Sequence, residues 1–114
     1  MIIRLINERD DRFSISRVYE ESWKSAYQGM LPQQYLDGIS TGHWVQFLNS
    51  SAHNTLVMLD DGKIIGTSSY GASRFEDMNR YGEIISIYLL PMYWGKGYGK
   101  QLLQATIDGL AQLG

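Results

Sequence analysis

The sequence predicts an α+β (mixed α/β) domain in which helices flank a central group of strands. Apolar residues recur at helical spacing near both ends of the chain, and the middle holds extended apolar runs that turn residues separate. We expect the element order β-α-α-β-β-β-α. The 114 residues contain no repeat and no linker-like segment, so residues 1–114 are expected to form a single domain with a modest core.

The N-terminal part combines one strand with helical segments. Residues 2–7 are rich in β-branched side chains and predict the first strand. The Asp pair at 10–11 offers N-caps for a helix whose apolar residues continue at helical spacing until Gly29. A proline opens a short second helix expected over 32–39, and residues 42–49 are typical of a further helical turn or two.

The middle of the chain changes to strands. Two apolar runs within 55–71 are joined at Asp61-Gly62, which predicts a β-hairpin. A polar loop is expected over 73–79, and a third extended run over 81–90 ends at a proline. The last helix is expected over 98–114, because leucine and isoleucine residues recur there on one face.

The composition excludes several classes of function. Lys and Arg number 10 and Asp and Glu 12, for a formal charge of −2, so nucleic acid and membranes are not expected as partners. The absence of cysteine excludes a disulfide framework, a thiolate metal site and a cysteine acyl-enzyme. His43 and His53 have dissimilar neighbours and indicate surface side chains, not a metal site. With no signal-peptide core and no membrane-length apolar run, we expect a cytoplasmic protein.

Three glycines at alternate positions, in the segment WGKGYGK (94–100), separate the third extended run from the last helix. Glycine costs conformational entropy, so this spacing indicates that the backbone must come close to another group. The first turn of a helix has unpaired N–H groups and the positive end of the helix dipole, which together bind anions. No acidic residue lies between Glu83 and Asp108, whereas Lys96 and Lys100 lie inside the turn. An anion site is therefore predicted, with a glycine-rich connection that binds nothing as the alternative.

The turn does not match the two common phosphate-binding motifs. A P-loop would need Gly in place of Trp94 and Ser or Thr in place of Gln101. The dinucleotide fingerprint would need Gly in place of Lys100, or Gly or Ala in place of Leu102. The residues alone therefore predict an anion site without identifying its ligand.

The run EIISIYLLPMYWGKGYGKQLL (83–103) resembles the acetyl-CoA motif of the GNAT superfamily of N-acetyltransferases. That motif is a strand, a turn containing proline, and then Q/R-x-x-G-x-G/A at the start of a helix. Residues 21–36 resemble the first-helix region of many bacterial members, and the hairpin falls where the family places its second and third strands. The resemblance covers essentially the whole chain and implies a GNAT-like, mostly antiparallel central sheet flanked by helices.

The resemblance implies that acetyl-CoA is the cofactor. In GNAT enzymes the pyrophosphate of coenzyme A lies on backbone N–H groups of the glycine turn, and the pantetheine arm follows the preceding strand. Carried over by position, the cofactor-binding residues are Ile87, Tyr88, Leu89, Trp94, Gly95, Lys96, Gly97, Tyr98, Gly99 and Lys100. Trp94 departs from the motif, which usually has Gln or Arg there, so weakened binding is expected, with Lys96 and Lys100 as compensation.

The same resemblance implies direct attack of a primary amine on the thioester, without a covalent enzyme intermediate and without a metal. The backbone N–H of Ile87 is expected to polarise the thioester carbonyl, as an oxyanion donor does. Glu83 stands where several GNAT enzymes place a general base, and a solvated glutamate at the strand end is the alternative. Trp23 and Tyr27, at i and i+4 on the first helix, are expected either to line the acceptor pocket or to pack in the core. Tyr70 is expected to face the same pocket.

The family fold continues past the last helix, so the resemblance implies a domain truncated before its fifth strand. The strand at 81–90 would then have an open edge, and a homodimer formed through that edge is expected. The leading hypothesis is acetyl transfer to a small-molecule or peptide amine. Two alternatives stay open: a non-catalytic module that binds CoA or self-associates, and an unrelated nucleotide-binding α+β domain.

Overall fold

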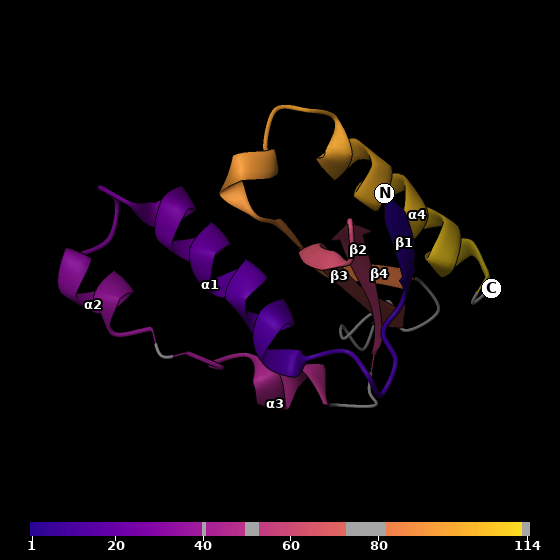
Figure 1. Cartoon of the computed structure of the whole chain (residues 1–114), viewed down its shortest axis with the longest axis horizontal. Helices are drawn as coiled ribbons and strands as arrows, with labels where there is room; N and C mark the ends of the chain where they lie inside the picture. The colour runs from indigo at the N-terminus through magenta and orange to yellow at the C-terminus, as the bar shows by residue number, and fades with distance from the viewer. Residues whose placement is uncertain (40, 50–52, 73–81, 113–114) are drawn as a thin grey trace.

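The computed structural model describes residues 1–39, 41–49, 53–72 and 82–112 (Figure 1). In chain order the elements are β1 (Ile2–Leu5), α1 (Arg12–Tyr27), α2 (Gln33–Asp37), α3 (Val45–Leu48), β2 (Asn54–Asp60), β3 (Lys63–Ala72), β4 (Gly82–Leu89), the 3-10 turn η2 (Pro91–Tyr93) and α4 (Tyr98–Gln112). The expected order is confirmed, with α3 as the helical turn foreseen within 42–49. The loop expected at 73–79 lies outside the described residues.

The strands form one antiparallel sheet in the order β1-β2-β3-β4. The turn between β2 and β3 has positive φ at both central residues, 50° at Asp61 and 80° at Gly62. This is the conformation that a two-residue hairpin favours and that an Asp-Gly pair accommodates. The α+β class predicted from the sequence is therefore confirmed.

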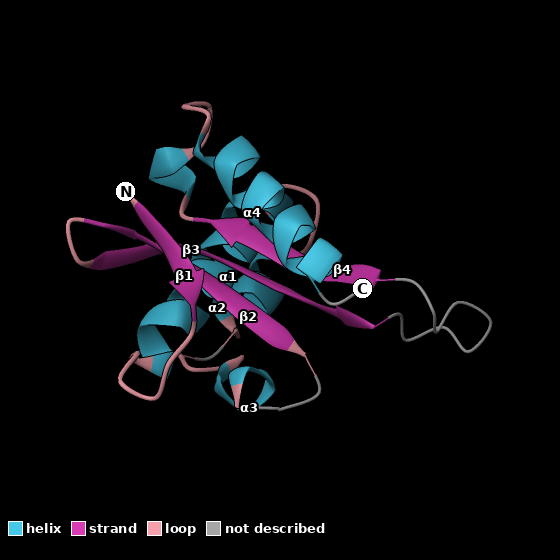
Figure 2. Cartoon of the chain, turned by 90° about the vertical axis from the view of Figure 1, so that its right-hand side faces the viewer, coloured by secondary structure: helices cyan, strands magenta, loops and turns pink. Residues whose placement is uncertain are grey.

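Helices cover both faces of the sheet (Figures 1 and 2). On one face α1 packs against β3, where the hydroxyl oxygens of Tyr19 and Ser69 lie 3.4 Å apart. On the opposite face α4 packs against the same strand, where the hydroxyl oxygens of Thr106 and Ser68 lie 2.7 Å apart. Since neighbouring strand residues point to opposite faces, these two contacts establish which β3 side chains face which helix.

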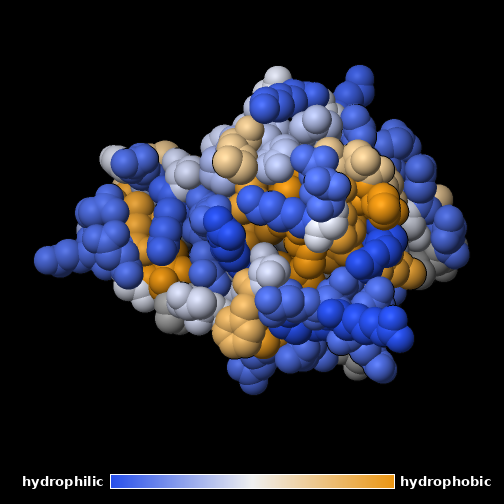
Figure 3. All heavy atoms as spheres, in the orientation of Figure 1, coloured by the Kyte–Doolittle hydropathy of each residue, from blue (hydrophilic) through white to orange (hydrophobic). Residues whose placement is uncertain are grey.

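The core consists of two buried clusters. One joins α1 and α4 through the sheet and contains Val18, Met58, Ile65, Leu89, Leu90 and Leu102. The other lies between α1, α3 and β2 and contains Ile15, Tyr19, Leu48 and Val57. Apolar side chains also reach the surface between α1 and α4, with hydrophilic residues around them (Figure 3). Leu102 of the first cluster anchors the beginning of α4, and so holds the preceding glycine turn next to β4.

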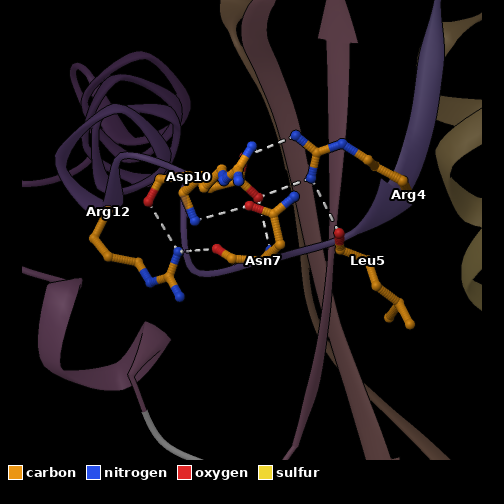
Figure 4. Close-up of polar contacts among 6 residues, drawn as sticks. Arg4, Leu5, Asn7, Asp10 and Arg12 are labelled. Atoms are coloured by element: carbon orange, nitrogen blue, oxygen red, sulfur yellow. Dashed lines mark hydrogen bonds and ion pairs between the residues drawn. The ribbon is translucent and has the colours of Figure 1, made fainter.

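Polar contacts join the end of β1 to the start of α1 (Figure 4). The Arg4 guanidinium donates two hydrogen bonds of 2.8 Å to the Asp10 carboxylate, and these bonds lower the pKa of Asp10 below its ordinary value. The Arg12 guanidinium donates to the carbonyls of Asn7 and Asp10, both at 2.9 Å. Of the two aspartates expected as N-caps, Asp11 caps α1, and Asp10 binds Arg4 instead.

Candidate functional site

The glycine turn, residues 94–100, leads from η2 into the first turn of α4 and owes its shape to its glycines. Gly95 and Gly97 have φ values of +76° and +85°, a region that residues with side chains rarely adopt. A Cβ added at Gly95, Gly97 or Gly99 would meet nothing within 4 Å. The glycines therefore do not relieve crowding inside the protein: they allow the left-handed backbone and leave open space beside it. Lys96 and Lys100 are exposed on the same turn.

A pocket of about 470 Å³ lies between β4 and the start of α4, and we call it the β4–α4 pocket. Its lining residues are Ile87, Tyr88, Leu89, Trp94, Gly95, Gly99, Lys100, Leu102 and Leu103. All of them except Leu102 and Leu103 are residues that the sequence assigns to cofactor binding. The remaining assigned residues, Lys96, Gly97 and Tyr98, do not line it. The structure thus brings most of the predicted set together around one pocket.

The outer edge of β4 presents backbone groups to this pocket. The Leu90 N–H donates to a β3 carbonyl at 2.8 Å, so the residues before it alternate between inward and outward backbone groups. The Leu89 carbonyl points outward and accepts from two side chains, the Ser22 hydroxyl at 2.8 Å and the Trp94 indole N–H at 2.7 Å. By the same alternation the N–H and C=O of Ile87 also point outward. Within the described ranges, β4 pairs with no strand other than β3.

Glu83 lies near the start of β4, half-buried and opposite Gly71 of β3. It precedes Ile87 by four residues, or about 13 Å along an extended strand. The two residues predicted to be catalytic therefore share one strand.

Trp23 and Tyr27 stack on each other on α1, with ring centroids 4.5 Å apart. The Trp23 indole N–H donates to the Tyr88 hydroxyl at 3.1 Å, which ties the pair to β4. A second pocket, of about 370 Å³, is lined by Trp23, Gln34, Tyr35, Gly38, Ile39, His43 and Trp44, and we call it the aromatic pocket. Because Tyr88 lines the β4–α4 pocket, the bond from Trp23 links the two pockets.

A buried polar link holds one wall of the aromatic pocket, the loop with His43 and Trp44, onto α1. The Glu20 carboxylate accepts from the Ser16 hydroxyl at 2.6 Å and from the Gly42 N–H at 2.9 Å. The Ser16 hydroxyl oxygen accepts in turn from the Trp44 N–H at 3.0 Å. Glu20 is 7% exposed, so this carboxylate is a structural anchor for the loop.

Tyr70 does not reach the aromatic pocket. Its neighbour Ser69 faces α1, since its hydroxyl lies beside that of Tyr19. Tyr70 therefore faces α4, where its hydroxyl would lie 2.5 Å from a Cβ placed on Gly109. The side chain is buried there, and burial raises the pKa of its phenol. The prediction that Tyr70 faces the same pocket as Trp23 is wrong, because one step along a strand reverses the face.

The two histidines differ more than the sequence indicates. His43 is exposed, as expected, and lies at the rim of the aromatic pocket. His53 is half-buried instead, with its ring stacked on Phe47 at a centroid distance of 4.3 Å. Burial lowers the pKa of His53. Among the described residues, no group of His, Cys, Asp and Glu side chains could hold a metal ion.

Several side chains that line or support the two pockets were not predicted from the sequence. Leu102 and Leu103 complete the β4–α4 pocket, and their one signal is their place one turn after the glycines. Trp44 comes from a short helical segment whose faces cannot be assigned from periodicity. Nothing in the sequence marks Ser22, a small polar residue on a helix, as part of the site. Tyr98, assigned to the cofactor, packs its side chain against the core.

Comparison with known proteins shows the family of this chain. Residues 15–114 match the family model described as "Acetyltransferase (GNAT) family". This chain belongs to the GNAT acetyltransferase family. The resemblance seen in the sequence is thereby confirmed.

Two curated GNAT relatives are similar to this chain over part of their length. The uncharacterized N-acetyltransferase YuaI of Bacillus subtilis is 29% identical over 107 residues, which are 92% of this chain and 62% of that protein. The L-methionine sulfoximine/L-methionine sulfone acetyltransferase of Salmonella typhimurium is 32% identical over 71 residues, 62% of this chain and 42% of that protein. The chain therefore spans less than two thirds of the length of either relative.

Solved structures share the fold. The PaiA N-acetyltransferase of Thermoplasma acidophilum, in complex with coenzyme A, has a TM-score of 0.75 at 22% identity, covering 98% of this chain and 74% of its own. A GNAT acetyltransferase of Brucella melitensis, in complex with acetyl-CoA, has a TM-score of 0.74 at 20% identity, covering 99% and 70%. No helix in the part of the GNAT chain that the structure describes is long and apolar enough to span a membrane.

Proposed function

We propose that this chain carries the acetyl-CoA site of a cytoplasmic N-acetyltransferase that moves acetyl to a primary amine by direct attack. The observation that carries the proposal is the β4–α4 pocket, where the outer edge of β4, a glycine turn and the start of a helix meet. The two structural relatives in complex with coenzyme A and acetyl-CoA support a cofactor of this class.

In this proposal the pyrophosphate of acetyl-CoA lies on the backbone N–H groups of residues 95–100. The left-handed glycines turn these groups toward the ligand, and the dipole of α4 adds positive potential. Lys96 and Lys100, both exposed, add full positive charges. The pantetheine arm follows the outer edge of β4 from Leu89 toward Ile87, against the apolar lining of the pocket.

The Ile87 N–H donates to the thioester carbonyl oxygen, whose negative charge grows as the amine nitrogen attacks the carbonyl carbon. The new C–N bond forms, the C–S bond breaks, and the electron pair leaves with sulfur as the CoA thiolate. Glu83 accepts the proton that the amine loses, and about 13 Å of strand between Glu83 and Ile87 makes a bridging water necessary. The products are the N-acetyl amine and CoA.

The aromatic pocket is the proposed acceptor site, with Trp23 as its wall on the β4 side and Tyr27 stacked behind it. The faces of aromatic rings attract an ammonium group, so the pocket suits a small-molecule or peptide amine. The name of the Salmonella relative, which acts on methionine sulfoximine and sulfone, supports an acceptor of amino-acid size.

Isothermal titration of acetyl-CoA tests the cofactor site. Gly97→Glu puts a carboxylate on the turn where the pyrophosphate lies, and we expect a loss of affinity of about a hundredfold or more. The matched control is Gly62→Glu in the β2–β3 turn, because Gly62 also has a φ of +80° and nothing within 4 Å of its Cβ. Unchanged binding by the control supports the proposal. An equal loss in both variants, or no binding by the unaltered chain, contradicts it.

A non-catalytic module that binds CoA or forms a homodimer is the second candidate, favoured by the outer edge of β4, which pairs with no strand among the residues that the structure describes. Strand pairing at that edge would cover the β4–α4 pocket, so dimerisation and acetyl-CoA binding would compete. Sedimentation velocity with and without acetyl-CoA tests this: a dimer that dissociates on addition of acetyl-CoA supports pairing through β4. Turnover of acetyl-CoA with a panel of amines then separates an enzyme from a binding module.

A further inference from the structure

The carbonyl oxygen of Leu89, the last residue of β4, joins three elements of the fold. It accepts one hydrogen bond from the Ser22 hydroxyl of α1 at 2.8 Å and another from the Trp94 indole N–H at 2.7 Å. A carbonyl oxygen has two lone pairs, so these bonds complete its capacity. Ser22 is 3% exposed and Leu89 8%. We call this group of three residues the Leu89 junction.

The Leu89 junction holds the end of β4 from both edges. On the inner edge the Leu90 N–H donates to the Ile65 carbonyl of β3 at 2.8 Å. On the outer edge the Leu89 carbonyl is bonded to α1 through Ser22 and to the glycine turn through Trp94. Because α1 and the turn share one acceptor atom, the turn cannot move along β4 without breaking a hydrogen bond.

Trp94 is well suited to this contact. An indole N–H donates and never accepts, so it requires an acceptor such as a carbonyl. The ring is 45% exposed and lines the β4–α4 pocket, while its N–H is used inside the protein. The residue that departs from the usual Gln or Arg of the GNAT motif is thus bonded to the strand along which the cofactor is proposed to lie.

We propose that Ser22 and Trp94 are positioning residues that set where the acyl-pantetheine arm of acetyl-CoA pairs with β4. This inference rests on the proposed function. With the Leu89 carbonyl saturated, an amide N–H of the arm finds no acceptor there, and the next outward-facing carbonyl is that of Ile87. A free Leu89 carbonyl would accept the same amide two residues nearer the turn. The thioester would then lie about 7 Å from its place at the Ile87 N–H.

The test compares two ligands in two variants. Trp94→Phe keeps a ring and removes the N–H, and Ser22→Ala removes the hydroxyl. Acetyl-CoA contacts both the turn and β4, whereas ADP supplies the pyrophosphate without a pantetheine arm. We expect each variant to bind acetyl-CoA about fivefold more weakly, because an arm paired at Leu89 loses its hydrogen bond to the Ile87 N–H, and to bind ADP as the unaltered chain does. Ser25→Ala, an exposed serine on the same helix, is the matched control and should leave both affinities unchanged.

Two further measurements separate positioning from loss of structure. The chain has three tryptophans, so the indole N–H signal of Trp94 can be assigned in NMR spectra by its loss in Trp94→Phe. In Ser22→Ala without ligand this signal should shift, because its acceptor has lost a second donor. The double variant should lose less acetyl-CoA affinity than the product of the single losses, since both side chains act on one carbonyl.

The outcomes distinguish this inference from the proposed function. Weaker acetyl-CoA binding with unchanged ADP binding supports the positioning role. Unchanged binding of both ligands overturns it and leaves the proposed function standing. An equal loss of affinity for both ligands also overturns it, because the loss then does not depend on the pantetheine arm. If the unaltered chain binds neither ligand, the proposed function and this inference both fail.

Discussion

The two pockets of this GNAT chain are built from different parts of the polypeptide. The β4–α4 pocket depends on backbone: a strand edge, a left-handed turn and the first turn of a helix. The aromatic pocket depends on side chains that α1, α2 and the loop before α3 bring together. A hydrogen bond from Trp23 to Tyr88 links them. A site for one constant cofactor can be made of backbone, whereas a site for a particular amine requires particular side chains.

The contrast has a consequence for substitution. Residues whose backbone faces the proposed cofactor site should tolerate a change of side chain, provided that the change fits the space. Residues that line or support the aromatic pocket should tolerate little. Substitutions at Glu20 and Trp23 test this contrast, and substitutions at Gly109 and Arg4, which line neither pocket, test the surrounding fold.

The largest effect is expected at Gly109, where α4 crosses Tyr70. The Cβ of Gly109→Ala would lie 2.5 Å from the Tyr70 hydroxyl and 2.6 Å from its Cζ, so the buried Tyr70 ring or α4 must shift. We expect a loss of about 2–3 kcal/mol in the free energy of unfolding, measured in urea. Gly99→Ala on the same helix meets nothing within 4 Å and should not destabilise the fold. Its methyl group enters the β4–α4 pocket, so it should weaken acetyl-CoA binding instead. Equal destabilisation by the two substitutions would contradict the packing described.

Glu20→Ala tests the support of the aromatic pocket. It leaves the Ser16 hydroxyl and the Gly42 N–H without their acceptor, and we expect a loss of about 2 kcal/mol in unfolding free energy. Acetyl-CoA affinity should not change. Glu21→Ala is the control, because Glu21 forms an exposed ion pair with Arg17 worth no more than about 0.5 kcal/mol. Similar losses in both variants would mean that the buried link does not hold the loop.

Trp23→Ala should separate the two substrates kinetically. We expect the KM of the amine to rise about tenfold, as for removal of a ring that binds ligand, with the KM of acetyl-CoA unchanged. Ile87→Val should change neither KM by more than about twofold, because the proposed site uses only the backbone of Ile87 and the two side chains are similar in volume. A rise confined to acetyl-CoA in the Trp23 variant would reverse the assignment of the pockets.

The smallest effect concerns acid stability. Hydrogen bonds from Arg4 lower the pKa of Asp10 in the folded state, so ionised Asp10 stabilises the fold above its unfolded pKa of about 3.9. This stabilisation is lost as the pH falls from the pKa of Asp10 in the unfolded chain through its lower pKa in the folded state. In Arg4→Gln the thermal midpoint should be slightly lower near neutral pH and fall less steeply below about pH 4. Both pockets lie away from this pair, so acetyl-CoA affinity at neutral pH should be the same. If the thermal midpoints of the two proteins depend on pH in the same way, the ion pair does not contribute to stability.

The turns and element ends that a few neighbouring residues determine could be predicted from the sequence. Asp61-Gly62 specified the hairpin, proline ended β4, and the alternate glycines located the turn before α4. These signals depend on backbone conformation, which a few residues decide. The sequence therefore predicted most of the residues that line the β4–α4 pocket, which is the proposed cofactor site.

The parts that depend on packing between distant segments were not predictable. Tyr70 was expected to face the same pocket as Trp23, but the face of a strand residue depends on its register with β2 and β4. His53 was expected at the surface, but its ring stacks on Phe47, which lies only six residues earlier, and the sequence pattern does not reveal such a ring contact. Ser22 and Trp94 meet at Leu89 from segments far apart in the sequence. Such contacts require the tertiary structure.

The central claim is that the cofactor lies on backbone groups of β4 and the glycine turn. Titration of acetyl-CoA into uniformly ¹⁵N-labelled chain, followed through backbone amide signals, tests it most directly. We predict the largest shifts at the amides of Ile87, Leu89 and residues 95–100, with small shifts along α2 and around Trp44. Largest shifts in the aromatic pocket, or none in the glycine turn at saturating acetyl-CoA, would contradict the account.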